Sequence, residues 1–367
     1  MFEKAYQKGL KKVSWMDDNL PDFPHITRGG RWLLSKEGHW TGGFFIGLLW
    51  LRYLEAPDEI QKGRILHWIG RIEKRTADNK THDMGFLFGP SCAFGYRITG
   101  NETLFKMARC GADNMMDLFN ERSGFILAWD EKGYEGTSIV DTAMNIPLML
   151  WVAEKTGDNK MTETAITAAD SILAHNVRPD GSTYHTVVWD EKGHVRGGTH
   201  QGYSNESCWS RGQAWALYGF SNMYRYTGDE KYLKASKKLA EYFWEHLDHH
   251  FLPRWDFIFQ NNDDQPLDCS AAGIGASGML LLSENLRLLD GAESGIWRER
   301  AEAILRALIE NALYEEIDKY GIIGKVTVDY PRRSGILESS MYGDYYFMEA
   351  LYRLKFAGNA EKLGLLY

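Results

Sequence analysis

The sequence has little that would place the chain in or across a membrane. Among its 367 residues, no apolar run reaches the length of a membrane-spanning helix. The start, "MFEKAYQKGLKKVSW", mixes acidic and basic residues and lacks the apolar segment of a signal peptide. These absences argue against a membrane partner, and we expect a cytoplasmic location.

Basic clusters and paired cysteines are also scarce. The formal net charge is −8, and Lys and Arg gather only in short pieces such as "KGLKKV", so no nucleic-acid partner is expected. The four cysteines, Cys92, Cys110, Cys208 and Cys269, lie far apart without a CxxC spacing. They indicate reduced, small apolar side chains and not a disulfide or zinc framework.

Signatures of several well-known chemistries are absent as well. No GxxxxGK[ST] loop and no GxSxG turn occurs, which argues against a phosphate-binding loop and a serine-hydrolase elbow. His82, His185 and His200 are candidate ligands or bases, but no HxxE or HExxH spacing supports a metal. We therefore expect no metal and no other cofactor.

Aromatic residues, in contrast, are abundant. They make up 13% of the chain, and 13 of them are Trp. Core packing is one explanation for so many large rings. The other is a site lined by flat rings that hold a cyclic ligand, most commonly a carbohydrate.

A recurring turn divides the chain into pairs of helices. The triplet TGN or TGD begins at Thr99, Thr156 and Thr227, and weaker forms occur near residues 290 and 358. Its glycine suits the left-handed position after a helix, and its Asn or Asp suits the cap of the next helix. On the left of each turn the pattern predicts an apolar helix, and on the right an amphipathic one.

Six such pairs can be drawn, the first over residues 44–76, and their loops are unequal. Long connections rich in Gly, Trp, His and Asp precede the apolar helices, whereas only tight turns follow them. An open solenoid would have similar loops at both ends. We therefore predict an all-α (α/α)6 barrel that forms a single domain over residues 1–367. Its six inner helices would begin at one end, where their N-termini favour an anionic ligand.

Aspartates stand at several of the expected inner-helix starts. Asp268 and Asp344 are expected to cap their helices. Asp83 and Asp141 are harder to explain as caps, because a proline that suits a first helical turn follows each of them several residues later.

For the second of these aspartates, the regular helix would begin at about Ile146, next to Pro147, and leave Asp141 in the preceding turn. Pro90 would act in the same way after Asp83. Both carboxylates would then face the end of the barrel. The pattern favours a functional pair over a purely structural one.

Arg211 lies on an otherwise apolar helix start, where a buried guanidinium needs an acidic partner. Asp141 or Asp83 could supply a structural ion pair. A ligand carboxylate held by the planar guanidinium is the alternative.

Six successive motifs between about residues 38 and 354 resemble those of the unsaturated glucuronyl hydrolases, glycoside hydrolase family 88. They are "HWTGGFFIGLLWL", "THDMGFLFGPSCAFGYRITGN", "DTAMNIPLMLWVAEKTGD", "HQGYSNESCWSRGQAWALYGF", "DCSAAGIGASGMLLL" and "SSMYGDYYFMEAL". The resemblance implies an (α/α)6 barrel without a metal. It also implies release of a 4,5-unsaturated glucuronic acid from the non-reducing end of di- or oligosaccharides.

The resemblance also implies residue roles. It matches Asp141 to the general acid/base, and Asp83 to a second carboxylate that holds ring hydroxyls and tunes Asp141. Substrate-binding positions are implied at Trp40, Trp129, His185, Gln201, Arg211 and Trp215. His200 rivals His185, and we expect Ser339 and Ser340, before the last inner helix, to bind substrate too.

The implied chemistry is hydration of a vinyl ether. Neutral Asp141 would protonate C4 of the sugar and then accept a proton from the water that adds to C5. Asp141 must therefore be protonated part of the time, which requires a raised pKa from burial and from the charge of Asp83. We expect the like-charge interaction with Asp83 to outweigh the helix N-termini and to give an acidic-side optimum.

Three alternatives stay open at this level. An unsaturated rhamnogalacturonyl hydrolase of family 105 would share the fold and chemistry, a sugar epimerase would use paired histidines, and a helical-repeat scaffold would lack the carboxylates. The leaving sugar is also open. Lys325, Arg332 and Arg333 either reach a sulfate group on it or are solvated loop charges.

Overall fold

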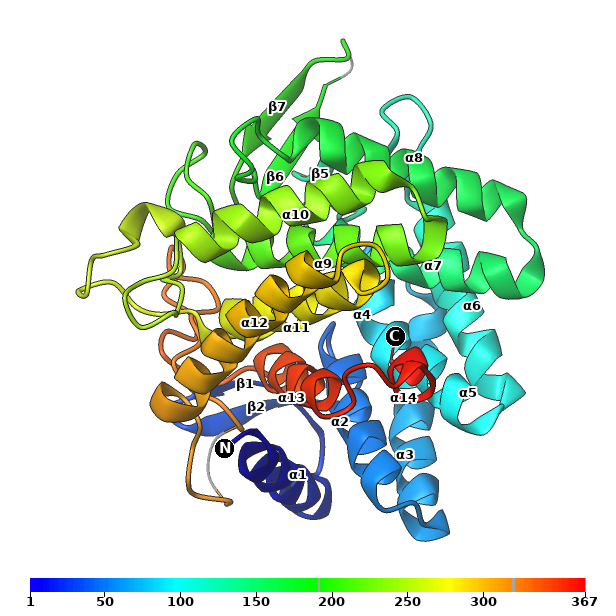
Figure 1. The fold of residues 1–367 in the computed structure, drawn as a ribbon. Helices are drawn as coiled ribbons and strands as arrows, with labels where there is room; N and C mark the ends of the chain where they lie inside the picture. Colours follow the sequence, from blue (N-terminus) through cyan, green and yellow to red (C-terminus); the bar gives the residue numbers. More distant parts are fainter. Residues whose placement is uncertain (191, 319–320, 367) are drawn as a thin grey trace.

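A computed structural model describes residues 1–190, 192–318 and 321–366. Its inner ring consists of six helical segments (Figure 1). They are α2 (Gly42–Glu55), α4 (Met84–Phe88) with its continuation α5 (Phe94–Thr99), α7 (Thr142–Thr156), α9 (Ser210–Thr227), α11 (Cys269–Leu286) and α13 (Met341–Lys355). Each segment packs against the next, and α13 returns to α2, so the ring is closed. The predicted (α/α)6 barrel is confirmed.

Six outer helices surround this ring. They are α1 (Phe2–Asn19), α3 (Glu59–Arg71), α6 (Glu102–Asp117), α8 (Asn159–His175), α10 (Glu230–Glu245) and α12 (Gly291–Asn311). The prediction that every inner helix is followed by its outer partner is wrong for the last one. α13 is followed only by the short α14 (Ala360–Leu365), and α1 from the other end of the sequence packs on α13, α2 and α12 instead.

The TGN and TGD turns have the expected geometry. Gly100, Gly157 and Gly228 adopt left-handed backbone angles, with φ of 66°, 73° and 67°. The Asn or Asp that follows each glycine accepts a hydrogen bond from the first turn of the next helix. These local contacts end each inner helix and begin the outer one, as predicted.

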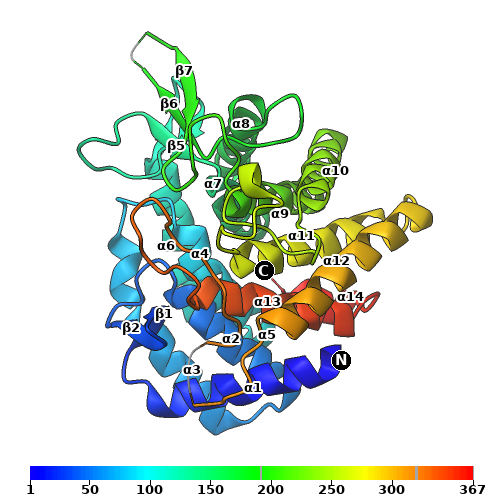
Figure 2. The same ribbon diagram turned by 90° about the vertical axis from the view of Figure 1, so that its left-hand side faces the viewer.

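Short strands occupy the long connections. They are β1 (Phe23–Arg28) with β2 (Arg31–Ser35), β3 (Phe119–Asn120) with β4 (Phe125–Ile126), and the sheet of β5 (Thr137–Ile139), β6 (Thr186–Trp189) and β7 (Val195–Gly198). Figure 2 looks from the side on which β1 and β2 lie in Figure 1. The antiparallel pairing of Ile139 with Thr186 brings the residues just beyond β5 beside the residue just before β6.

The remaining short elements are two 3-10 turns, η1 (Glu73–Ala77) and η3 (Phe257–Phe259), and a π-helical turn, η2 (Gly89–Ala93), between α4 and α5. Within residues 1–190, 192–318 and 321–366, every helix is too short or too polar to cross a lipid bilayer.

Candidate active site

Asp83 and Asp141 stand immediately before two inner helices, α4 and α7. Both helices lie wholly within the described residues, and neither carboxylate accepts a hydrogen bond from the first turn of its own helix. An aspartate at this position ordinarily satisfies a free N–H there. The two side chains are instead directed to other groups and are only 16% and 13% exposed.

The helix starts themselves differ from the prediction. α7 begins at Thr142, not near Ile146, and contains Pro147, whereas α4 begins at Met84 and Pro90 lies in the wide π-helical turn that follows. A proline removes a single backbone donor, and a π-helical turn gives its ring room inside a helix. The prolines therefore do not explain why the two carboxylates leave their own helices uncapped.

Asp141 is brought next to His185 by the pairing of β5 with β6. The Val140 N–H donates to the His185 carbonyl oxygen (2.9 Å), and His185 Nε2 lies 3.7 Å from Asp141 Oδ1. His185 Nδ1 accepts from the backbone N–H groups of His200 (3.3 Å) and Gln201 (3.2 Å). Burial lowers the pKa of His185 well below its usual value, so the ring is neutral and carries its proton on Nε2, facing Asp141.

The environment of Asp141 favours its protonated form. Burial, and next to it the charge of Asp83, raise the pKa of Asp141 to about 7, against the opposing charge of Arg211. The direction agrees with the expectation from the sequence, but burial, and not the charge of Asp83, is the larger cause. Asp141 Oδ1 and His185 Nε2 are both buried without a hydrogen bond to any other part of the described chain.

Asp83 has a different set of neighbours. Its Oδ2 accepts from the Thr81 hydroxyl (2.9 Å), and its Oδ1 lies 3.4 Å from Nε2 of the fully buried His82. Burial lowers the pKa of His82, which leaves this ring neutral as well. Each carboxylate of the pair thus has one neutral imidazole beside it.

The sequence suggested Asp141 or Asp83 as the ion-pair partner of Arg211, but Arg211 pairs with neither of them. Its guanidinium forms a buried ion pair with Asp268 at the start of α11, and it donates to the backbone carbonyls of residues 327–328. The ion-pair alternative named the wrong aspartates, because the partner comes from α11, 57 residues away, whereas the binding of a ligand carboxylate stays a prediction. Arg211 acts on Asp141 through its positive charge.

The two expected caps have different outcomes. Asp268 accepts from an N–H in the first turn of α11, which confirms it as a cap. For Asp344 the prediction is wrong, because Ser340 caps α13 and Asp344 lies inside its first turn. There Asp344 accepts from the Ile323 N–H (3.0 Å), and burial raises its pKa to about 7.

Ser339 and Ser340 are both fully buried at the start of α13. The Ser340 hydroxyl oxygen accepts from the Gly343 N–H (3.1 Å), and that of Ser339 accepts from the Gly321 N–H (3.2 Å). These bonds give both serines a structural role. Their part in substrate binding stays a prediction.

Aromatic rings lie near the inner-helix starts and beside His82. The half-buried Trp40 stacks on Tyr342, with ring centres 5.2 Å apart and planes tilted by 22°. Trp129 packs edge-on against His82 (6.2 Å). Trp215 is only 1% exposed and belongs to the core. Tyr342 was not among the residues expected from the sequence, although its place in the first turn of an inner helix was a usable signal.

Three further contacts lie at the edge of this group. The His200 ring packs against Trp129 (5.6 Å), and its Nδ1 lies 3.2 Å from a guanidinium nitrogen of Arg332. The Gln201 side-chain amide donates to the Val328 carbonyl (2.8 Å). Of the two rival histidines, His185 is therefore the one beside Asp141. Among the described residues, no group of three or more His, Cys, Asp or Glu side chains is placed to hold a metal ion.

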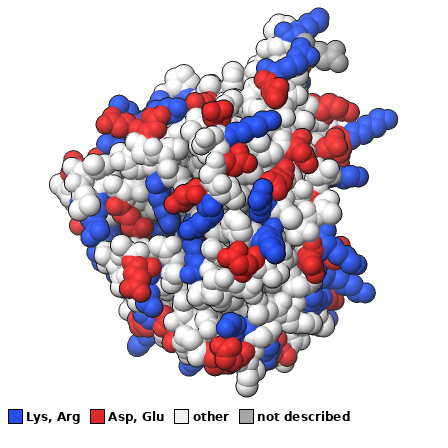
Figure 3. Space-filling view, turned by 90° about the vertical axis from the view of Figure 1, so that its right-hand side faces the viewer, with Lys and Arg blue, Asp and Glu red and all other residues white. Residues whose placement is uncertain are grey.

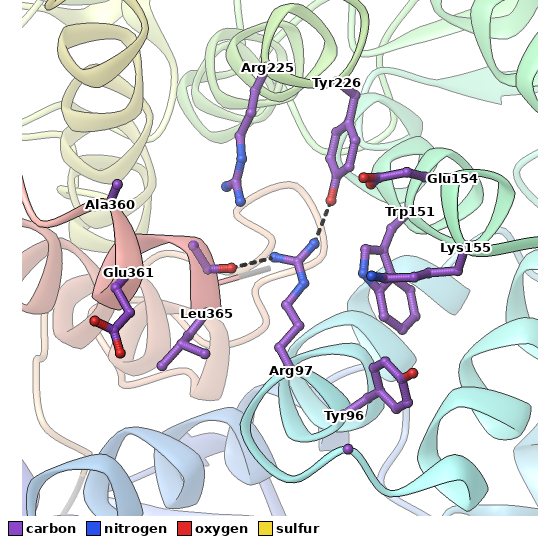
Figure 4. A pocket seen from close by; sticks show the side chains of 12 residues that line it. Tyr96, Arg97, Trp151, Glu154, Lys155, Arg225, Tyr226, Ala360, Glu361 and Leu365 are labelled. Atoms are coloured by element: carbon purple, nitrogen blue, oxygen red, sulfur yellow. Dashed lines mark hydrogen bonds between the residues drawn. The ribbon is translucent and has the colours of Figure 1, made fainter.

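A cavity of about 740 Å³ lies elsewhere, where α5, α7 and α9 end (Figure 4). Its walls include Tyr96, Arg97, Trp151, Lys155, Arg225 and Tyr226. Arg97 donates to the Tyr226 hydroxyl (2.8 Å) and to the Leu366 carbonyl, and none of the candidate site residues lines this space. On the face of the molecule in Figure 3, basic and acidic side chains are interspersed.

At the start of the inner helices of this closed double ring, two mostly shielded carboxylates interact electrostatically, and the raised pKa of Asp141 marks this end of the barrel as the candidate active site of an enzyme. The sequence profile of Glycosyl Hydrolase Family 88 matches residues 22–251. The chain belongs to this family, which confirms the resemblance noted in its motifs.

Known proteins resemble the chain along most of its length. It is 33% identical to an unsaturated chondroitin disaccharide hydrolase of Streptococcus agalactiae, over 96% of this chain and 90% of the relative. The structure of an unsaturated glucuronyl hydrolase from Bacillus sp. GL1, responsible for the degradation of glycosaminoglycan, superposes with a TM-score of 0.91 and 31% identity, covering 97% of each chain. An aspartate-to-asparagine variant of the Streptococcus agalactiae unsaturated glucuronyl hydrolase, complexed with dGlcA-GalNAc6S, gives a TM-score of 0.83 and 29% identity, covering 96% of this chain and 91% of that one.

Proposed function

We propose that Asp141 is the general acid/base of a hydration reaction that releases 4,5-unsaturated glucuronic acid from the non-reducing end of an oligosaccharide. Membership of family 88 makes the chain a glycoside hydrolase that acts on such unsaturated substrates. The observation that carries the proposal is the buried Asp141 carboxyl, whose pKa of about 7 leaves it partly protonated near neutral pH.

The reaction proceeds in two proton transfers on one carboxyl group. Protonated Asp141 gives its proton to C4, and the vinyl ether becomes an oxocarbenium-like centre at C5. Water adds to C5 while the Asp141 carboxylate accepts one of its protons. The resulting hemiketal opens and releases the remaining sugar, so no nucleophile is needed at the anomeric carbon, unlike in ordinary glycosidases.

The neighbouring groups divide the remaining tasks. The Asp83 carboxylate accepts hydrogen bonds from ring hydroxyls. Its negative charge raises the pKa of Asp141 and so favours the protonated form. The His185 Nε2–H donates to the bound sugar, and Trp40 and Trp129 pack against its faces. The positive charge of Arg211 favours binding of the uronate carboxylate of the substrate.

Unsaturated glycosaminoglycan disaccharides are the proposed substrate class. The Streptococcus agalactiae relative is named for chondroitin disaccharide, and dGlcA-GalNAc6S is the compound in the neighbouring structure. On the leaving side, Arg332 is held by Asp329 and His200 at the edge of the site. Gln201, Trp215, Ser339 and Ser340 complete the proposed binding residues.

The test follows the ultraviolet absorbance of the C4=C5 bond while the protein acts on a panel of unsaturated disaccharides. Wild type removes the absorbance, and Asp141→Asn lowers kcat by about 10²- to 10⁴-fold, the usual share of general acid/base catalysis. Asp158→Asn is the matched control, because it alters the cap of α8 beyond the far end of α7. Turnover of Asp141→Asn near the wild-type rate would contradict the role of Asp141 as the acid/base. Persistent absorbance with wild type across the whole panel would contradict the proposed function.

A further inference from the structure

The first turn of α4 is capped from outside its own helix. The Phe86 N–H, third in α4, donates to Asn145 Oδ1 at 2.8 Å. This amide is one that the side chain of the N-cap residue ordinarily satisfies. Here the N-cap residue is Asp83, and Asn145 of α7 takes its place.

Because Asn145 caps α4, the Asp83 carboxylate is available for other contacts. Elsewhere in the barrel, Asn101, Asp158, Asp229 and Asp268 each cap the helix that they precede. Asp83 and Asp141 do not. At the start of α4, Asn145 holds the Phe86 N–H, and the Asp83 carboxylate faces Thr81 and His82.

Asn145 also contacts the other carboxylate turn. Its Nδ2 donates to the backbone oxygen of Asp141 at 3.2 Å, so one buried amide joins the two helix starts. Close backbone approach makes this contact feasible. A Cβ on Gly85 would lie 2.4 Å from the Asn145 Cα, a distance that no side chain tolerates.

A second hydrogen bond links the same two turns. The Thr142 hydroxyl, first residue of α7, lies 2.8 Å from His82 Nδ1. Since His82 is neutral and its Nε2 faces Asp83, the proton belongs on Nε2 and the Thr142 hydroxyl donates to Nδ1. His82 adjoins Asp83 and Thr142 adjoins Asp141, so this bond fixes the spacing of the two turns.

We propose that Asn145 and Thr142 are positioning residues for the catalytic pair: together they hold Asp83 away from its own helix end and within electrostatic reach of Asp141. Neither touches the reacting atoms. The inference rests on the proposed function, because it concerns the acid/base group of that reaction.

The expected consequence is electrostatic. Charged or titratable groups that act on Asp141 are Asp83 and Arg211, with His185 beside it, and those around Asp83 are His82 and His39. Without Asn145, the start of α4 is no longer tied to the start of α7, and the charge of Asp83 then moves away from Asp141. The pKa of Asp141 would fall, so the alkaline limb of the kcat profile would move to lower pH.

The test compares Thr142→Val, which keeps the shape of the side chain, with Thr142→Ser, which keeps the hydroxyl. Thr142→Val and Asn145→Ala are each expected to lower kcat by about 10- to 100-fold with little change in KM, and to shift the alkaline limb to lower pH. Thr142→Ser restores the wild-type limb. Thr156→Val, at the other end of α7, is the control and leaves both quantities unchanged.

Two further measurements separate the explanations. Thermal unfolding measures the stability of each variant. If Thr142→Val and Asn145→Ala lose stability but keep the wild-type pH profile, their role is merely structural and the inference is overturned. The carboxyl resonance of labelled Asp141, titrated by NMR, needs no substrate. A wild type that is inactive on every disaccharide therefore contradicts the proposed function, whereas an unshifted Asp141 titration in both variants contradicts the positioning role. If Asn145→Ala fails to fold, the Thr142 pair decides.

Discussion

At Asp141, burial and the charge of Asp83 both favour a proton that the catalytic step needs. The same features oppose the ionised carboxylate in the folded chain, whereas the unfolded chain ionises freely at a pKa of about 3.9. Active sites commonly accept such a loss of stability for function. The Asp141 carboxyl is thus expected to weaken the fold wherever it is ionised in the unfolded state.

The sign of the resulting pH dependence is defined. The folded pKa of Asp141, about 7, is raised above the unfolded value. The contribution of Asp141 to the free energy of unfolding is therefore fully present below about pH 4 and is lost as pH rises through 7. Asp141→Asn removes this loss. The variant is expected to be more stable than wild type at pH 8, by up to about 4 kcal/mol, given a folded pKa of about 7 and an unfolded pKa of about 3.9. Thermal unfolding at pH 5 and pH 8 tests this, and equal pH slopes for both proteins would contradict it.

At the residue level, the sequence correctly indicated that Asp83 and Asp141 do not cap their own helices, and their catalytic role stays a prediction. They stood out because a proline follows each of them several residues later, although the helices in fact begin directly after the two aspartates. The Arg211 partner and the serine cap of α13 depend on which helices become neighbours, and spacing along the chain does not contain that information. The proline rule failed for the same reason, since it considers one helix at a time.

At the level of elements, the inner-helix starts are joined by buried polar contacts between neighbours. α4 and α7 share Asn145, and α9 and α11 share the ion pair of Arg211 with Asp268. A buried ion pair is costly to break, because removal of one partner leaves the other charge unpaired. These contacts fix how the helix ends meet at the site.

Asp268→Asn tests the second link. The asparagine can still cap α11, but Arg211 loses its counter-charge in the interior, so unfolding in urea is expected to show a loss of about 3–5 kcal/mol. Asp290→Asn is the control, because Asp290 caps the outer helix α12 without a buried partner among the described residues. Similar urea midpoints for the two variants would show that the ion pair contributes little.

At the level of the whole molecule, closure of the double ring gathers six helix starts at one end. The TGN and TGD turns are local signals, so the pairing of inner and outer helices could be predicted from the sequence. The sixth outer helix could not, because α1 joins the ring through contacts with α13 at the opposite end of the chain. The closed ring is what brings β5, β6 and α4 together around Asp141.

The most direct test of hydration by Asp141 is isotope incorporation. In heavy water, wild type acting on an unsaturated disaccharide should place deuterium at C4 of the released sugar within the first turnovers, because the exchangeable proton of Asp141 is delivered there. Mass spectrometry and NMR of the quenched product locate the label. Deuterium at C4 with wild type, and its near absence with Asp141→Asn, is the predicted result; release of the leaving sugar without deuterium at C4 would contradict the mechanism.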